Sequence, residues 1–180
     1  GEAQQTKLAA MEAMWETEPA PASFNLFALP NEKEMRNDYA IEIPYVMGLI
    51  GTRSLDKEIP GIKEIMAKNR ERIISGIKAV TALEALRKNE SNTNAKSLFE
   101  AHKEDLGFGL LLRKYTTNVS DATDAMIDQA TRDTIPKVTP MFWSFRIMVG
   151  LGFAMLLLFA FAAWYAVKGT SNGWRWVEYF

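Results

Sequence analysis

The chain has 180 residues with 21 basic and 22 acidic side chains, giving a formal net charge of −1, and it contains no cysteine and one histidine. The balanced charge argues against a nucleic-acid partner, because nucleic-acid-binding domains usually carry a basic excess. The composition excludes disulfides, thiolate metal sites and histidine pairs within this chain. Because the sequence starts without Met or an apolar targeting segment, we interpret it as a piece of a longer protein.

The first predicted element is a helix over residues 6–17. Apolar side chains recur there at spacings of three and four, at Leu8, Met11 and Trp15. We expect Pro19 to end this helix, because proline cannot donate the backbone hydrogen bond that a helix interior requires.

A small β-hairpin is predicted next. Two short runs with partial alternation, 23–29 and 37–43, are separated by Pro30 and a polar segment. The apolar run 45–51 that follows is too short to span a bilayer, so we expect a buried helical turn there.

Three further helices are predicted in the polar part of the chain. A long amphipathic helix covers residues 60–88, with proline tolerated in its first turn. A polar linker separates it from a helical stretch over 95–115, which Gly107-Phe-Gly109 interrupts. Residues 120–134 form the last of the three, and the serine and aspartate at its start are suitable caps.

Residues 138–167 are predicted to cross a membrane as one helix. The uncharged part, Ile147–Val167, is about 31 Å long as a helix, which matches the hydrocarbon core of a bilayer. Aromatic residues near both ends, Trp143 and Trp164-Tyr165, lie where the two interfacial belts are expected. Arg146 is the only charged residue of the segment.

Two residues of this span are candidates for cofactor chemistry. Met148 is a potential thioether ligand to haem iron, although methionine more often simply packs. The guanidinium of Arg146 would pair with a carboxylate such as a haem propionate, or extend to the lipid headgroups. Residues two apart on a helix point about 200° from one another, so these two side chains leave the backbone in different directions.

Lys7 and Glu12 are the candidate pair near the N-terminus. The simplest interpretation is a solvated helix face, since five residues place them about 140° apart. They would also suit the two sides of a small quinol pocket, where Glu12 accepts a hydroxyl proton and Lys7 hydrogen-bonds the other oxygen. His102 lies in a charged stretch and is interpreted as a surface residue.

Several strings resemble subunit I of the cytochrome bd oxidases, in the same order along the chain. They are Thr6-Lys-Leu-Ala-Ala-Met-Glu12, Trp15-Glu-Thr17, Ile43-Pro-Tyr45, Thr52-Arg-Ser54, Leu106-Gly-Phe-Gly-Leu-Leu-Leu-Arg-Lys-Tyr-Thr-Thr-Asn118 and Phe145-Arg-Ile-Met148.

The resemblance implies a role for each candidate residue. Lys7 and Glu12 match the family's quinol-binding and quinol-oxidising positions, Met148 matches the axial ligand of the low-spin haem b, and Arg146 matches the arginine that supports this haem. The second axial ligand would lie outside this chain. In the complete subunit, electrons would pass to a high-spin haem b and a haem d, where O2 is reduced to water.

The predicted fold class is therefore mainly α: a helical extracytoplasmic loop domain with a small β-hairpin and one transmembrane helix. The resemblance implies that residues 1–135 form a periplasmic quinol loop, with parts 1–88 and 95–135. Residues 138–167 would cross the inner membrane, and 168–180 would be cytoplasmic.

The implied partners are quinol, lipid, the missing helices of the same subunit, subunit II and a small accessory subunit. The quinol type, ubiquinol or menaquinol, stays open. The alternative is a non-enzymatic adaptor or sensor module on one membrane anchor, which would need only the amphipathic helices and the span.

Overall fold

The computed structural model describes residues 2–20, 22–44 and 58–168. The helices are α1 (Glu2–Glu12), α2 (Ile62–Lys88), α3 (Thr93–His102), α4 (Leu106–Leu110), α5 (Asp124–Asp133) and α6 (Val138–Val167), and the strands are β1 (Phe24–Asn31) and β2 (Arg36–Ile43). The predicted mainly α fold with one small antiparallel sheet is confirmed for the described residues. The helical turn expected at 45–51 lies outside them.

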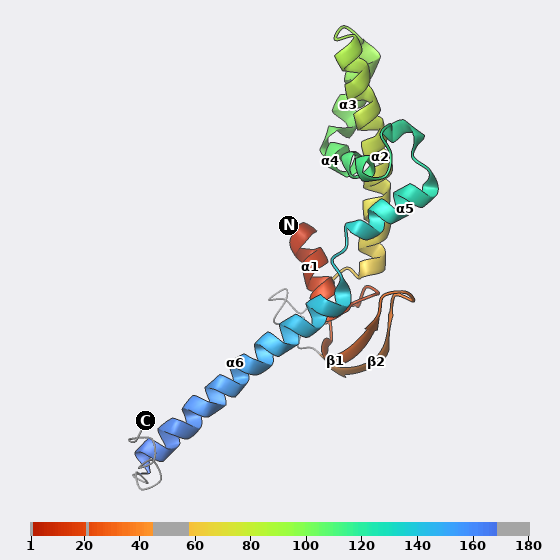
Figure 1. The fold of residues 1–180 in the computed structure, drawn as a ribbon. Coiled ribbons are helices and arrows are strands. Elements are labelled where there is room, and N and C mark those ends of the chain that lie inside the picture. Colours follow the sequence, from red (N-terminus) through yellow and green to blue (C-terminus); the bar gives the residue numbers. More distant parts are fainter. Residues whose placement is uncertain (1, 21, 45–57, 169–180) are drawn as a thin grey trace.

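Three parts of the molecule are visible in Figure 1. One arm is built on α2, with α3, α4 and α5 alongside it, and α6 projects in the opposite direction. The helix α1 and the hairpin lie where the arm meets the start of α6. Two clusters of buried apolar side chains match this division, one at the junction around Met14 and Phe142 and one along the arm around Ile73 and Leu112.

Helix α1 ends earlier than the sequence predicted. Its last residue is Glu12, and Ala13 has a positive φ of 51°. The amide of Met14 donates to Ala9 O at 2.9 Å and the amide of Ala13 donates to Ala10 O at 3.3 Å, which together form a Schellman cap. The predicted end before Pro19 was wrong because this local cap stops the helix first.

The hairpin prediction is confirmed, with slightly shifted ends. Strands β1 and β2 pair antiparallel from Phe24 opposite Ile43 to Asn31 opposite Arg36. Pro30 lies inside β1 rather than in the turn, at a register irregularity, where a missing backbone donor is tolerated.

The segment after α1 accepts hydrogen bonds from the first residues of α2. The amides of Ile62 and Lys63 donate to Met14 O at 2.8 Å and Trp15 O at 3.0 Å. These bonds satisfy donors that a helix N-terminus otherwise leaves free. The observed helix, Ile62–Lys88, agrees with the predicted 60–88 to within two residues.

The predicted helix over 95–115 is a series of shorter pieces. After α3 come a 3₁₀ turn at Lys103–Asp105, the short α4 and another 3₁₀ turn at Leu111–Lys114. The bends let α4 turn back onto α2, where the backbones of Gly76 and Gly109 touch. The glycine motif is therefore a helix-crossing site.

The last helix of the arm also begins later than predicted. Residues Val119–Asp121 form a 3₁₀ turn, and α5 starts at Asp124. Its cap is Thr123, whose hydroxyl accepts from the amide of Met126 at 3.4 Å, rather than the serine and aspartate at 120 and 121.

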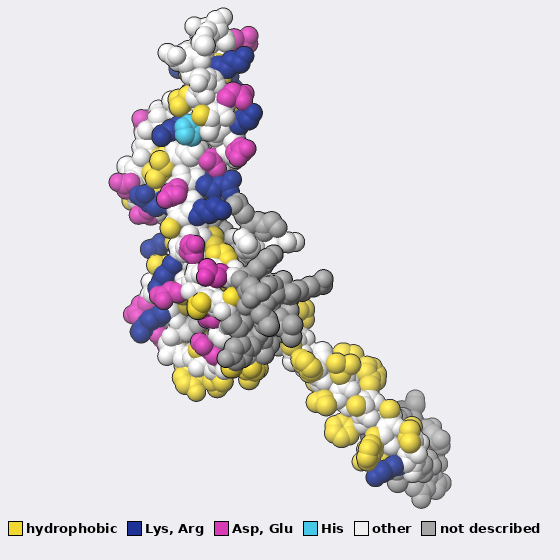
Figure 2. All heavy atoms as spheres, turned by 180° about the vertical axis from the view of Figure 1, so that it is seen from behind, with side chains coloured by type: hydrophobic (Ala, Val, Ile, Leu, Met, Phe, Trp, Pro, Cys, Tyr) yellow, Lys and Arg dark blue, Asp and Glu magenta, His cyan; other side chains and the backbone are white. Residues whose placement is uncertain are grey.

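Helix α6 has the predicted bounds, Val138–Val167. It is the one helix among the described residues that is long and apolar enough to cross a membrane. Figure 2 shows hydrophobic side chains along it, whereas charged side chains cover the visible face of the arm. Its buried residues, Val138 and Phe142, lie in the first turns, which pack against α1 and β1.

Candidate functional site

A buried ion pair joins α1 to α6. The Nη2 atom of Arg146 lies 2.7 Å from Oε2 of Glu12, and Nη1 lies 3.4 Å from Oε1. The exposed fractions of the two side chains are 11% and 2%. Glu12 is the last residue of α1 and Arg146 lies in the third turn of α6, so the pair brings together two of the four candidate residues.

The guanidinium of Arg146 is held on several sides. Besides Glu12, it donates to the backbone carbonyls of Met11 and Asn25. Its central carbon lies 3.8 Å from the ring centroid of Phe142, at cation–π distance. The arginine turns into the protein rather than extending to lipid headgroups, and the carboxylate it meets belongs to this chain.

Burial decides the acid–base behaviour of Glu12. Loss of solvation raises the pKa of its carboxyl group above 4.5, and the hydrogen bonds and charge of Arg146 partly oppose that rise. The carboxylate also lies at the C-terminus of a helix, where the helix dipole disfavours negative charge. Without Arg146, an ionised Glu12 at this position would strongly destabilise the fold.

Side chains from three elements cap successive carbonyls at the end of α1. Arg146 binds Met11 O, Asn25 of β1 donates to Glu12 O at 2.8 Å, and Asn37 of β2 donates to Ala13 O at 3.1 Å. A helix C-terminus leaves such carbonyls without partners. The hairpin and α6 thus hold the backbone of Glu12 in place.

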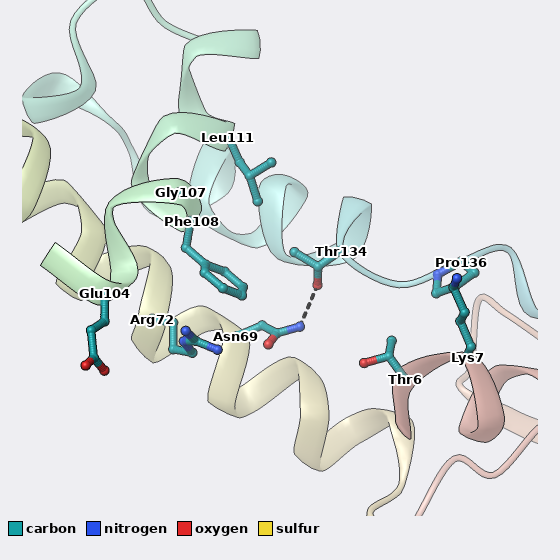
Figure 3. Close-up of a pocket in the computed structure, with 10 residues that line it drawn as sticks. All are labelled: Thr6, Lys7, Asn69, Arg72, Glu104, Gly107, Phe108, Leu111, Thr134 and Pro136. Carbon is teal, nitrogen blue, oxygen red and sulfur yellow. Dashed lines mark hydrogen bonds between the residues drawn. The ribbon is translucent and has the colours of Figure 1, made fainter. Parts of the chain in front are cut away.

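Lys7 lies elsewhere on α1, and its side chain is exposed. It lines a cleft of about 540 Å³ between α1, α2, α4 and the segment after α5. Figure 3 shows Phe108 pointing into this space, with Asn69 and Thr134 hydrogen-bonded to each other at 2.8 Å. Glu12 is not among the lining residues, because five positions along the helix turn it toward α6.

Met148 lies one half-turn beyond Arg146 on α6, and its side chain is 61% exposed. No described part of the chain covers it. Its thioether is therefore accessible to a group outside this chain. Among the described residues there is no cluster of three His, Cys, Asp or Glu side chains suited to a metal ion.

The surface interpretation of His102 was incomplete. The residue is half-buried, and its Nδ1 lies 2.8 Å from the hydroxyl of Ser75 on α2. Nearby, Arg72 donates to Asp105 at 2.7 Å and lowers the pKa of that carboxyl group. His102 belongs to the polar contacts that attach the end of α3 to α2.

Sequence reasoning did not identify Asn25. It is 3% exposed and contacts both members of the ion pair, through its amide to Glu12 and its carbonyl to Arg146. The sequence feature that could have identified it is a polar residue in a strand that is otherwise mostly apolar.

The geometry defines a class of protein: a helical domain with a charged surface, locked by a buried ion pair to an apolar helix of membrane-spanning length. The whole chain, residues 1–180, matches the family model described as cytochrome bd terminal oxidase subunit I. The chain therefore belongs to this family.

Two relatives show the extent of the likeness. The chain is 40% identical over 174 residues to cytochrome bd-II ubiquinol oxidase subunit 1 of Escherichia coli (strain K12), which covers 97% of this chain and 34% of that protein. It is 22% identical over 175 residues to cytochrome bd ubiquinol oxidase subunit 1 of Bacillus subtilis (strain 168), covering 97% of this chain and 25% of that protein. The chain thus spans about a third or less of these relatives' length.

Proposed function

We propose that this chain is part of a membrane quinol oxidase of the cytochrome bd type. In this proposal residues 1–135 are periplasmic, α6 crosses the inner membrane and 168–180 are cytoplasmic. The complete subunit, with subunit II and a small accessory subunit, oxidises quinol at the outer face and passes electrons through haem to reduce O2 to water. Family membership and the names of the relatives support this assignment.

The observation that carries the proposal is the Glu12–Arg146 pair. It fixes the helix proposed to oxidise quinol directly on the helix proposed to hold haem, with 2.7 Å between the charged groups. Electron transfer from quinol to haem requires the two sites to be close, and a buried pair of this kind fixes their relative position.

The proposed roles at the quinol follow from the acid–base chemistry of its oxidation. A quinol that becomes a quinone gives up two electrons and two protons. Glu12 accepts a hydroxyl proton, and a pKa raised by burial makes it a better base once ionised. Lys7 is exposed at a cleft that Glu12 does not line, so its proposed hydrogen bond to the other oxygen requires the two side chains to approach one another when quinol binds. Because Glu12 is buried, proton transfer to it requires movement at the end of α1.

The residues on α6 fit a haem. Met148 has an exposed thioether, which is a ligand that raises the potential of haem iron. The Nε–H of Arg146 is buried and has no acceptor in the structure, so it suits an anionic group such as a propionate. Met148 and Arg146 would hold a low-spin haem b, which would supply a one-electron carrier, and the second ligand would come from outside this chain. The high-spin haem b and haem d belong to the rest of the subunit.

Replacing Glu12 with Ala in the complete oxidase tests the quinol role. We expect the rate of quinol oxidation to fall by about 10²–10⁴, the usual contribution of a general base. Oxidation of an artificial one-electron donor, which needs no proton acceptor, should stay within a few-fold of wild type. Equal loss with both donors would contradict the role of Glu12.

Replacing Met148 with Leu tests the haem role. Leucine has a similar volume but no sulfur, so the helix should insert normally and the low-spin haem should lose its axial ligand. The measurement is the reduced-minus-oxidised absorption spectrum of the purified complex. A matched control is Met155→Leu, another exposed methionine on α6. An unchanged low-spin signal in Met148→Leu would refute the ligand assignment.

The adaptor or sensor alternative gains no support from a particular contact. Family membership argues against it, and the buried ion pair goes beyond what a simple membrane anchor requires.

A further inference from the structure

We propose that Asn25 is a positioning residue for Glu12: it holds the backbone of this residue so that the carboxylate meets the guanidinium of Arg146. This inference rests on the proposed function of Glu12 as proton acceptor. It adds a residue of the β-hairpin to the quinol-oxidising site.

Asn25 is placed between the two charged residues. Its Nδ2 donates to Glu12 O at 2.8 Å, and its own backbone carbonyl accepts from Nη2 of Arg146, the same nitrogen that binds Oε2 of Glu12. The three residues come from β1, α1 and α6 and form one closed set of hydrogen bonds. Each residue thus helps to hold the other two in their observed positions.

The orientation of the Asn25 amide is fixed by this set. Turning it round would place Oδ1 against the carbonyl oxygen of Glu12, where neither atom can donate. In the observed orientation Oδ1 is buried and has no donor in the structure. A buried acceptor without a partner is costly, so packing alone would favour an apolar side chain here.

Arg146 is the charged group that contacts Glu12 within the part of the chain that the structure describes. Strand β1 carries no charged residue, and Lys7 on α1 is exposed. The other charged groups close to these elements have partners or positions elsewhere. Arg36, Asp38 and Glu42 on β2, Glu16 after α1, and Lys63 and Glu64 at the start of α2 are exposed, and the half-buried Glu18 accepts from Ser23. The ionisation of Glu12 therefore depends on how closely Arg146 is held.

The test uses the complete oxidase carrying Asn25→Leu or Asn25→Asp, assayed with ubiquinol-1 over a pH series. Either change removes the donor to Glu12 O, and the aspartate also adds a carboxylate that competes for Arg146. A weaker pair with Arg146 favours the protonated form of Glu12. The acid limb of kcat/KM should then move to higher pH, by about one unit, and further for Asp than for Leu.

Asn37 provides a matched control. Its Nδ2 donates to Ala13 O at 3.1 Å, one residue beyond Glu12, and its Oδ1 accepts from Trp15 Nε1 at 2.9 Å. It contacts neither Glu12 nor Arg146 in the structure. Asn37→Leu and Asn37→Asp should lower stability by loosening the same helix end but leave the acid limb in place.

The outcomes separate the inference from the proposed function. If Glu12→Ala leaves quinol oxidation unchanged, the role of Glu12 fails. If Glu12→Ala abolishes the activity while the Asn25 variants and the Asn37 variants show the same acid limb, the positioning role of Asn25 is overturned. If the Asn25→Asp oxidase fails to assemble, comparing the acid limb of Asn25→Leu with that of Asn37→Leu decides whether Asn25 positions Glu12.

Discussion

At the scale of single residues, Arg146 explains why a charge is tolerated at the beginning of an apolar helix. Its charge is met by Glu12, its Nη1 and Nη2 atoms also donate to the backbone carbonyls of Met11 and Asn25, and one face of the guanidinium lies against Phe142. Charged residues at membrane depth require such partners. Removing one member of a buried pair typically costs about 3–5 kcal/mol, because the other charge is left buried alone.

The pH dependence of stability should reveal the titration of the Glu12 carboxyl group. Burial raises the pKa of its carboxyl group above 4.5, so the folded protein holds this proton more tightly than the unfolded chain does. The contribution of this group to stability is present below pH 4.5 and is lost as the pH rises through the folded pKa. Thermal unfolding of the purified oxidase over a pH series should show that Glu12→Gln removes this loss.

Glu16→Gln is the control for that experiment. Glu16 is exposed and its pKa is lowered by the hydrogen bond from Lys63, so any effect of this residue on the pH slope has the opposite sign. If Glu12→Gln and wild type respond identically to pH, the buried acid does not titrate in this range.

At the scale of elements, the crossing of α2 and α4 depends on two glycines. A Cβ atom on Gly76 would overlap the backbone of Gly109, and one on Gly109 would overlap the backbone of Gly76. Neither helix can yield easily, because the second apolar cluster lies along the same contact. Phe108, which lines the Lys7 cleft, lies on α4, so the crossing of α4 with α2 also holds this side of the cleft in place.

Replacing Gly76 or Gly109 with Ala should therefore destabilise the arm by about 3 kcal/mol through overpacking. Gly107 offers a matched control in the same short helix, since a Cβ there meets nothing within 4 Å. Gly107→Ala should be neutral or stabilise by about 0.5–1 kcal/mol. Amide hydrogen exchange of α4 in the complete subunit measures both effects. Similar protection in all three variants would refute the close crossing.

At the scale of the whole molecule, a charged arm contrasts with an apolar α6, and the proposed membrane arrangement rests on this contrast. The arm carries the charged surface, and α6 carries exposed apolar side chains from Ile147 to Val167. The hairpin lies at the boundary, where Phe27 packs on Trp143 of α6 with ring centroids 5.3 Å apart. This arrangement places the Glu12–Arg146 pair at the same boundary.

This chain contains no cysteine, so once any cysteines elsewhere in the oxidase are replaced, single cysteines introduced here test the proposed topology. Single cysteines at the exposed positions Ser91 and Lys168 place one thiol on each side of α6. In intact cells a membrane-impermeant maleimide should label Ser91→Cys of the complete oxidase. Lys168→Cys should react only after permeabilisation. The reverse pattern would invert the proposed orientation.

The sequence by itself determined the elements that depend on local pattern. The long helix α2, the hairpin and the bounds of α6 were predicted closely, because periodicity and hydrophobicity act over neighbouring residues. The C-terminal end of α1 and the start of α5 were not, since each depends on a cap that competes with the proline or side-chain signals nearby.

Only the tertiary structure decided how the candidate residues meet. Glu12 and Arg146 are 134 positions apart, and no local pattern relates them. The early end of α1 turns Glu12 toward α6 and leaves Lys7 at a separate cleft. Asn25 contacts both Glu12 and Arg146 only because β1 packs against the end of α1 and the start of α6. The physical reason is that a buried charge must find its partner in the packed core, wherever that partner lies in the sequence.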